Sequence, residues 1–147
     1  MLIEEVIVVP ATPQQLDAIH AALDRFWATV ATTVSRSPDG GWRTRFATAV
    51  AEISANIIRH AYPDAREPGP MRLHLYAYPD RIEAYFSDEG VAFMSPLPVE
   101  DGPETDPLEL PESGRGLAVA QACLDELGYR RTGEGTNEWR LVKRLPG

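Results

Sequence analysis

Hydrophobic and polar residues alternate along several short segments of the chain, and this period of two predicts β-strands. Residues 71–78 and 81–87 alternate cleanly, and the Pro79-Asp80 dipeptide between them predicts a tight hairpin. Residues 2–9 are rich in β-branched side chains and stop at Pro10, which predicts another strand. The residues expected to face the core are Met71, Leu73, Leu75, Ala77, Ile82, Ala84 and Phe86.

Two longer segments carry apolar residues at the three- and four-residue spacing of a helix. The first is expected to begin with Thr12 as N-cap and Pro13 at the first helical position, and to end near residues 35–41. The second runs from about residue 42 to residue 62, where Pro63 ends it. The apolar stripes are Leu16, Ile19, Leu23, Phe26, Trp27 and Val30, then Trp42, Phe46, Ala49 or Val50, Ile53 and Ile57.

The second half of the chain contains a long irregular segment at about residues 95–113, with five prolines, six acidic residues and no lysine or arginine. A third helix is expected from Gly114 to Leu127, closed by Gly128, and then a hairpin of residues 129–132 and 138–145. This order of elements predicts one α+β domain over residues 1–147. We expect a two-layer sandwich with a mixed, mostly antiparallel sheet and helices on one face.

Composition narrows the class of protein. The chain of 147 residues carries a formal net charge of −8, which argues against direct binding to nucleic acid or to an anionic membrane. No apolar run approaches the roughly 20 residues that span a bilayer, and the first residues show no secretory signal. The single cysteine, Cys123, cannot form an internal disulfide. We therefore expect a single-domain cytoplasmic protein.

Three polar residues share a stripe on the second predicted helix. Glu52, Asn56 and His60 recur at four-residue spacing, beside the apolar face of the helix. A carboxylate can orient or deprotonate a hydroxyl nucleophile, and an amide oxygen is a hard ligand for Mg²⁺. His60 could touch a phosphate or interact with the nearby helix C-terminus. Taken alone, this stripe is more typical of a solvated polar face.

Two further motifs carry candidate chemistry. Asp88-Glu89-Gly90 ends a predicted strand, where an aspartate can accept a hydrogen bond from the amine of adenine and a glycine allows close approach of a flat ring. Gly114-Arg115-Gly116-Leu117 opens the third helix, where glycine N–H groups and the helix N-terminus can favour an anion. Alone, the first motif is also typical of an ordinary turn, and the second of a plain loop-to-helix transition.

Together, in this order and spacing, the three motifs resemble the N, G1 and G2 boxes of the GHKL (histidine-kinase-like) ATPase superfamily. The closer resemblance is to the anti-sigma-factor serine/threonine kinases of the RsbW and SpoIIAB type, and it covers nearly the whole chain. The stretches that carry it are AVAEISANIIRHAY (residues 49–62), FSDEGVAFMSP (86–96), ESGRGLAVAQACLDELGY (112–129) and RLVKRL (140–145).

The resemblance implies a Bergerat-type ATP-binding fold and a role for each matched residue. Glu52 would be the general base or the carboxylate that orients the nucleophile. Asn56 would ligate Mg²⁺ at the ATP phosphates, and Asp88 would bind the adenine amine beside Gly90. The residues implied at the phosphate end, under an ATP lid at about residues 95–113, are Gly114, Arg115, Gly116 and Leu117. Thr136 would lie on the adenine side.

The implied function is an ATP- and Mg²⁺-dependent serine/threonine protein kinase that acts as an anti-sigma factor. Its implied partners are an antagonist of the STAS type, which it phosphorylates, and a sigma factor; homodimers are common in that family. One alternative is a nucleotide-binding partner-switch adaptor without phosphotransfer, which the acidic lid favours. The ATP-binding half of a two-component system and a gyrase-type ATPase are disfavoured, because we identify no sensor, dimerisation or transducer segment in the sequence.

Overall fold

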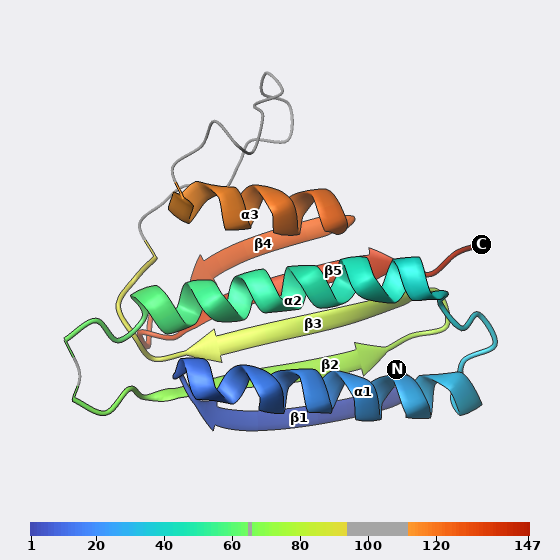
Figure 1. Ribbon diagram of the computed structural model, residues 1–147, viewed down its shortest axis with the longest axis horizontal. Helices are drawn as coiled ribbons and strands as arrows, with labels where there is room; N and C mark the ends of the chain where they lie inside the picture. Colours follow the sequence, from blue (N-terminus) through green and yellow to red (C-terminus); the bar gives the residue numbers. More distant parts are fainter. Residues whose placement is uncertain (65, 94–111) are drawn as a thin grey trace, which may run out of the picture.

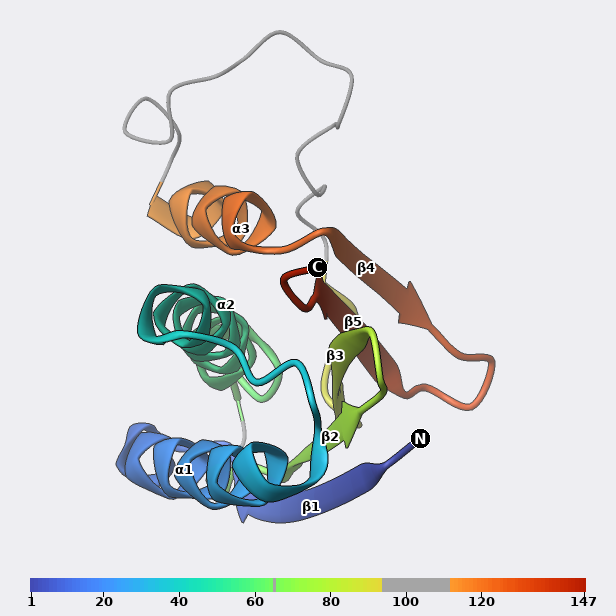
Figure 2. The same ribbon diagram turned by 90° about the vertical axis from the view of Figure 1, so that its right-hand side faces the viewer.

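The structure is a computed structural model that describes residues 1–64, 66–93 and 112–147. Five strands form one sheet in the order β1-β2-β3-β5-β4, and every neighbouring pair is antiparallel. Helices α1, α2 and α3 all lie on the same face of this sheet (Figures 1 and 2). The predicted two-layer α+β sandwich is confirmed. The elements are β1 (Ile3–Pro10), a 3-10 turn (Pro13–Gln15), α1 (Leu16–Thr33), α2 (Gly40–His60), β2 (Pro70–Ala77), β3 (Arg81–Asp88), α3 (Glu112–Cys123), β4 (Glu126–Arg131) and β5 (Asn137–Arg144).

The alternation in the central strands places their apolar side chains under the helices. All seven residues predicted to face the core from β2 and β3 are fully buried. The hairpin between these strands closes with a hydrogen bond from Tyr78 N–H to the Arg81 carbonyl at 2.8 Å. Because side chains alternate between the two faces of a strand, this register fixes which residues face the helical layer.

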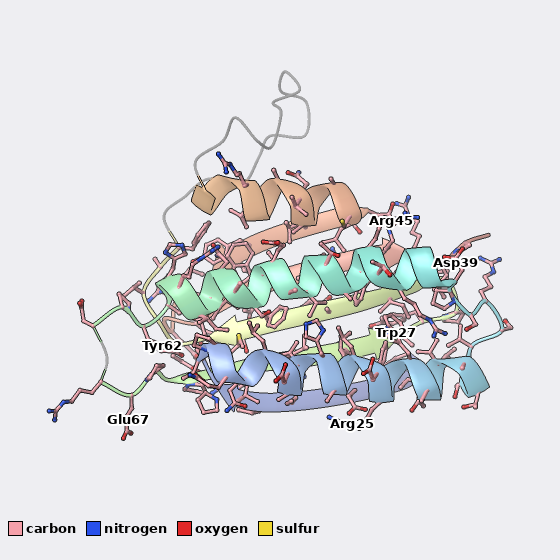
Figure 3. The ribbon with its side chains drawn as sticks, in the orientation of Figure 1. Arg25, Trp27, Asp39, Arg45, Tyr62 and Glu67 are labelled. Atoms are coloured by element: carbon pink, nitrogen blue, oxygen red, sulfur yellow. The ribbon has the colours of Figure 1, made fainter. Side chains whose placement is uncertain are left out.

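Helices α1 and α2 are joined by an aromatic cluster. The Asp39 side chain caps α2 by accepting a hydrogen bond from Trp42 N–H at 2.8 Å, which explains why α2 begins two residues before the predicted start. The Trp42 ring lies 5.7 Å from that of Trp27 and 5.5 Å from that of Phe46, and its indole N–H donates to the Arg144 carbonyl at 2.7 Å. Figure 3 labels Trp27 and Asp39 at this end of the sandwich. These contacts fix α2 over the sheet.

The start of α1 differs in detail from the prediction. Thr12 has the extended backbone of an N-cap and Pro13 follows it, but the first turn is a 3-10 turn and the Thr12 side chain makes no capping hydrogen bond. The regular helix begins at Leu16 and ends at Thr33. Its predicted apolar stripe is buried from Ile19 to Val30 and packs on the sheet and on α2.

The predicted limits of the third helix are wrong. Helix α3 runs from Glu112 to Cys123, and Gly128 lies inside β4 instead of capping a helix. The chain leaves the helix early because Asp125 binds the end of β5. Its N–H donates to the Val142 carbonyl at 2.9 Å, and its carboxylate accepts from Arg144 N–H at 2.6 Å. These bonds start β4 at residue 126, where the sequence predicted more helix.

The predicted lid lies largely outside the described residues, which resume at Glu112. The last two residues of that predicted segment, 112 and 113, form the start of α3. Of the helices in the described ranges, none combines the length and the apolar character needed to cross a bilayer.

Candidate functional site

A pocket lies where the C-terminal ends of α2 and β3 meet the start of β5. These ends of the three elements lie at the left-hand side of Figure 1. It contains about 210 Å³ of empty space, part of which is open to solvent. Four polar side chains line it together with apolar residues that include Phe93 and Trp139. The four polar residues are Asn56, His60, Asp88 and Asn137. Three of these were predicted from two motifs that are far apart in the sequence.

Asp88 is a buried carboxylate with one oxygen satisfied by the protein. It is 1% exposed, and its Oδ1 accepts hydrogen bonds from Gly90 N–H and from Asn137 Nδ2, both at 2.8 Å. Its Oδ2 accepts no hydrogen bond from any described residue. Burial raises the pKa of the carboxyl, while the bonds from Asn137 and Gly90 oppose that rise. The unused oxygen suits Asp88 to bind a hydrogen-bond donor of a ligand.

The turn that follows Asp88 is held from both sides. The Tyr62 hydroxyl donates to the Pro70 carbonyl at 2.7 Å and accepts from Glu89 N–H at 3.0 Å. Arg72 pairs with the Glu89 carboxylate at 2.6 Å. Figure 3 labels Tyr62 at this end of α2. The hydroxyl therefore links the residue next to Asp88 to the first residue of β2.

Position 90 requires a glycine because the chain there lies directly against the C-terminal end of α2. A Cβ at this position would overlap the carbonyl oxygen of Ala61 and lie 2.6 Å from the Ala61 Cβ. The Val91 N–H donates to the same carbonyl at 2.8 Å. The prediction that Gly90 allows a flat ligand ring to approach is untested, but the close approach of α2 already excludes a side chain here.

Gly90→Ala should lower the free energy of unfolding by about 3 kcal/mol, the upper part of the range for overpacking, because the clashing atoms are backbone atoms that cannot rotate away. Gly128→Ala is the matched control: a Cβ there meets nothing within 4 Å, so its effect should stay within about 0.5 kcal/mol. Urea unfolding of both variants measures the difference. Equal stability of the two variants would contradict the packing described for Gly90.

Asn56 and His60, in the last two turns of α2, each have a buried polar atom without a hydrogen-bond partner in the described part of the chain. These atoms are Asn56 Oδ1 and His60 Nε2. The His60 ring packs against Phe93 with ring centres 6.1 Å apart. Burial, with the nearby charge of Arg59, lowers the pKa of His60, which favours the neutral ring. A buried polar atom without a partner is costly, so these two atoms indicate a site that is completed by a ligand.

Glu52 lies one helical turn before Asn56 but does not line this pocket. Helix α3 packs against α2, and a Cβ added to Gly116 would lie 2.5 Å from Glu52 Oε2. The glycine thus leaves room for the carboxylate between the two helices. Glu52 and Gly116 were predicted on separate motifs, and the structure brings them into contact.

The other residues of the third motif are helical. Gly114, Arg115 and Gly116 lie in the first two turns of α3, which begins two residues before the predicted start at Gly114. Leu117 is 2% exposed and belongs to the hydrophobic core. Thr136 lies in the turn between β4 and β5, where its N–H donates to Thr132 Oγ1 at 3.1 Å, and it does not line the pocket. The roles of these residues toward phosphate and adenine stay predictions.

Asn137, which the sequence analysis missed, lies beside Asp88 in the pocket. The two residues are direct partners in the register of β3 and β5. The available signal was the alternation of β5, in which residues 137, 139 and 141 face the core. A polar side chain in such an inward set needs a hydrogen-bond partner, and here that partner is Asp88.

The oxygen atoms that line the pocket fit a magnesium ion whose remaining coordination positions are filled by a bound phosphate and water. Within the described ranges no group of three or more His, Cys, Asp or Glu side chains could hold a metal by itself. Mg²⁺ commonly uses one or two protein oxygens, with phosphates and water completing its coordination. The unpartnered oxygen Oδ1 of Asn56 is one such donor.

Comparison with known proteins finds related sequences over most of the chain. The family model described as "Histidine kinase-like ATPase domain" matches residues 9–143. The chain is 31% identical over 103 residues to Serine-protein kinase RsbW of Staphylococcus epidermidis, in a match that covers 65% of this chain and 64% of that protein. It is 24% identical over 142 residues to Serine-protein kinase RsbW of Staphylococcus aureus strain RF122, covering 92% of this chain and 85% of that protein.

A third relative, Serine-protein kinase RsbW of Halalkalibacterium halodurans, is 35% identical over 85 residues, with 54% of this chain and 49% of that protein covered. The chain thus matches less than two thirds of the length of the Staphylococcus epidermidis and Halalkalibacterium relatives. Among solved structures, the Acinetobacter baumannii histidine kinase AdeS has a TM-score of 0.53 at 16% identity, covers 100% of this chain and 70% of its own, and so shares the fold. Since the family model spans nearly the whole sequence, this chain belongs to the histidine kinase-like ATPase domain family.

Proposed function

We propose that this protein is an ATP-dependent serine/threonine protein kinase that acts as an anti-sigma factor in the cytoplasm. The observation that carries the proposal is the convergence of Asn56, His60 and Asp88 on one pocket. There, one acceptor atom of Asn56 and one of Asp88 bind no other described residue. The similarity to three proteins named Serine-protein kinase RsbW supports the choice of a protein hydroxyl as acceptor.

In this proposal each residue acts on a different part of the reaction. Asp88 Oδ2 accepts a hydrogen bond from the 6-amino group of adenine, and Asn56 Oδ1 would hold Mg²⁺, which neutralises phosphate charge when bound. The acceptor hydroxyl forms a bond to the γ-phosphorus as the bond to the β,γ-bridging oxygen breaks, and ADP leaves with that electron pair. Glu52 receives the hydroxyl proton as general base.

The proposed partners follow from the same similarity. The phosphorylated protein would be an anti-sigma-factor antagonist of the STAS type, and a sigma factor would be the protein sequestered after that phosphorylation. A second copy of the chain is a further proposed partner. The excess of acidic residues over basic ones is consistent with regulation through protein partners, without direct contact to nucleic acid.

A second candidate function is a partner-switch adaptor that binds nucleotide without transferring phosphate. The observation that favours it is the position of Glu52, whose carboxylate packs against Gly116 of α3 and lies outside the pocket. For transfer, the acceptor hydroxyl must reach this carboxylate at the junction of α2 and α3. The two functions are separated by incubating the protein with labelled ATP and a partner protein captured from the native cell.

Asn56→Ala should weaken the binding of Mg-ATP by about tenfold or more while changing the affinity for metal-free ATP by less than about threefold. The reason is that the substitution removes the proposed oxygen ligand of Mg²⁺ but leaves the base-binding Asp88 in place. The fold should survive, because Asn56 Oδ1 makes no hydrogen bond in the described structure. Isothermal titration calorimetry with ATP, in excess Mg²⁺ and in excess chelator, measures both affinities.

Ser54→Ala provides the matched control for Asn56→Ala. Ser54 is a buried polar residue of the same helix, but its hydroxyl donates to the Val50 carbonyl at 2.8 Å and does not line the pocket. Its substitution should leave both affinities unchanged. An equal loss of affinity with and without Mg²⁺ in Asn56→Ala would mean that the residue supports the pocket and does not bind the metal.

A further inference from the structure

Asn137 is the centre of a buried hydrogen-bond network around Asp88. Asn137 is the first residue of β5, and only 2% of its surface is exposed. The amide nitrogen Nδ2 donates to Asp88 Oδ1 at 2.8 Å and to the Val91 carbonyl at 2.9 Å. The amide oxygen Oδ1 accepts from the Tyr129 hydroxyl at 2.6 Å and from Arg131 Nη1 at 2.9 Å. Every hydrogen-bonding group of the amide is therefore used by the protein.

Two neighbours determine which end of this amide faces Asp88. Arg131 has only donors, so the atom that it contacts must be the amide oxygen. The Tyr129 hydroxyl accepts a hydrogen bond from Phe93 N–H at 2.9 Å, which leaves its own proton for the same amide oxygen. The amide nitrogen must then face the carboxylate. Arg131 also donates to the Gly90 carbonyl at 3.0 Å, so it ties the turn after Asp88 to β4.

This orientation matters for how the carboxylate can bind a purine. Two donors, Gly90 N–H and Asn137 Nδ2, converge on Asp88 Oδ1 and favour the ionised form of a group that burial would otherwise neutralise. An ionised carboxylate is an acceptor only, so Oδ2 can bind the 6-amino group of adenine but not a 6-oxo group. A protonated carboxyl could donate to a 6-oxo purine as well.

We propose that Asn137, oriented by Tyr129 and Arg131, is the positioning residue that keeps Asp88 ionised and thereby sets the preference of the pocket for a 6-amino over a 6-oxo purine nucleotide. The inference rests on the proposed function, because it requires that Asp88 bind the base of ATP. Asn137 would thus determine base specificity from β5, outside the predicted motifs. The two residues that orient it, Tyr129 and Arg131, lie in β4.

The test compares the affinities of the protein for ATP and for inosine triphosphate, which carries an oxygen in place of the 6-amino group. Asn137→Asp keeps the shape of the side chain but replaces the donor Nδ2 by an oxygen. Loss of the Nδ2 donor and the repulsion of a second carboxylate both favour protonation of Asp88, and a proton on Asp88 Oδ2 can be donated to a 6-oxo group. We expect the ratio of the two dissociation constants to fall by about tenfold or more from its wild-type value. Calorimetry at saturating Mg²⁺ measures the ratio.

A second variant keeps the test valid if Asn137→Asp does not fold. Arg131→Met removes the charged donor that orients the amide while leaving Asn137 in place, and it should lower the same ratio by at least about threefold. Arg130→Met is its matched control. Arg130 is the preceding residue of β4, it is exposed, and its ion pair with Glu138 at 2.6 Å lies on the surface, so the ratio should stay within about twofold of wild type.

The ratio separates a role in specificity from a role in folding. A variant that binds ATP and inosine triphosphate more weakly by the same factor would show that the network only supports the pocket, which overturns the inference. If the wild type prefers ATP and the folded variants keep its ratio, the inference fails and the proposed function stands. If the wild type binds neither nucleotide, the proposed function fails and the inference fails with it.

Discussion

Glu52→Gln should reduce phosphoryl transfer by about 10²- to 10⁴-fold, the range associated with loss of a general base, while the affinity for ATP stays within about twofold. Glutamine keeps the size of the side chain, so the packing of α2 against Gly116 should be preserved. It cannot take the proton of the acceptor hydroxyl. Because Glu52 does not line the pocket, we expect nucleotide binding to be independent of its charge. Single-turnover transfer to the captured partner protein, with ATP binding measured in parallel, gives both quantities.

The control for this variant is Glu67→Gln, which removes a carboxylate in the exposed segment between α2 and β2 (Figure 3). It should transfer phosphate at the wild-type rate. Full transfer activity in Glu52→Gln would mean that the catalytic carboxylate is placed wrongly. A parallel loss of ATP affinity and of transfer would mean that Glu52 acts through the structure of the pocket.

Asp88→Asn should weaken ATP binding by about 100-fold or more, which corresponds to about 2.7 kcal/mol. The new amide can keep its oxygen toward the two donors, Gly90 N–H and Asn137 Nδ2. Its NH₂ group then occupies the position of Oδ2 and faces the amine of adenine with a donor instead of an acceptor. In the wild type, ATP binding should also weaken as the pH falls through the raised pKa of Asp88, and the variant should lack this dependence. Thermal shift and calorimetry over a range of pH measure both effects.

Asp80→Asn is the matched control, since Asp80 is exposed and pairs with Arg81 at the opposite end of β3. This variant should bind ATP as the wild type does. Unchanged ATP affinity in Asp88→Asn, or equal stabilisation of the wild type by ATP and GTP, would contradict the assignment of Asp88 to the adenine base.

Strands β2 and β3 and the first two helices could be predicted because the apolar residues of each element follow a single period without interruption. In β2 and β3 the alternation alone identified the buried face, from Met71 to Ala77 and from Ile82 to Phe86. The end of α3 could not be predicted in this way. It depends on Asp125 binding the distant strand β5, and the local sequence up to Leu127 is as suitable for a helix as for a strand.

In the candidate site, too, the residues that depend on contacts between distant segments could not be predicted. Asn56, His60 and Asp88 could be found from motifs, since their spacing within each segment is local. Asn137 could not be placed beside Asp88, because that contact depends on the register between β3 and β5, which is set by the whole sheet. The glycines also have reasons that only packing reveals: Gly90 accommodates the end of α2, and Gly116 accommodates Glu52.

The proposed kinase and the proposed adaptor share the nucleotide pocket and differ only in transfer. Both require that ATP bind at Asp88, so binding experiments alone cannot separate them. The difference lies at Glu52, which must reach an acceptor hydroxyl at the junction of α2 and α3.

The most direct measurement is therefore the transfer of labelled γ-phosphate from ATP to the partner protein captured from the native cell, followed by identification of the modified residue. The proposed function predicts a phosphoserine or phosphothreonine on that partner, formed by the wild type in the presence of Mg²⁺ and nearly absent with Glu52→Gln. Stable binding of ATP and of the partner without any label on the partner would contradict it and would favour the adaptor.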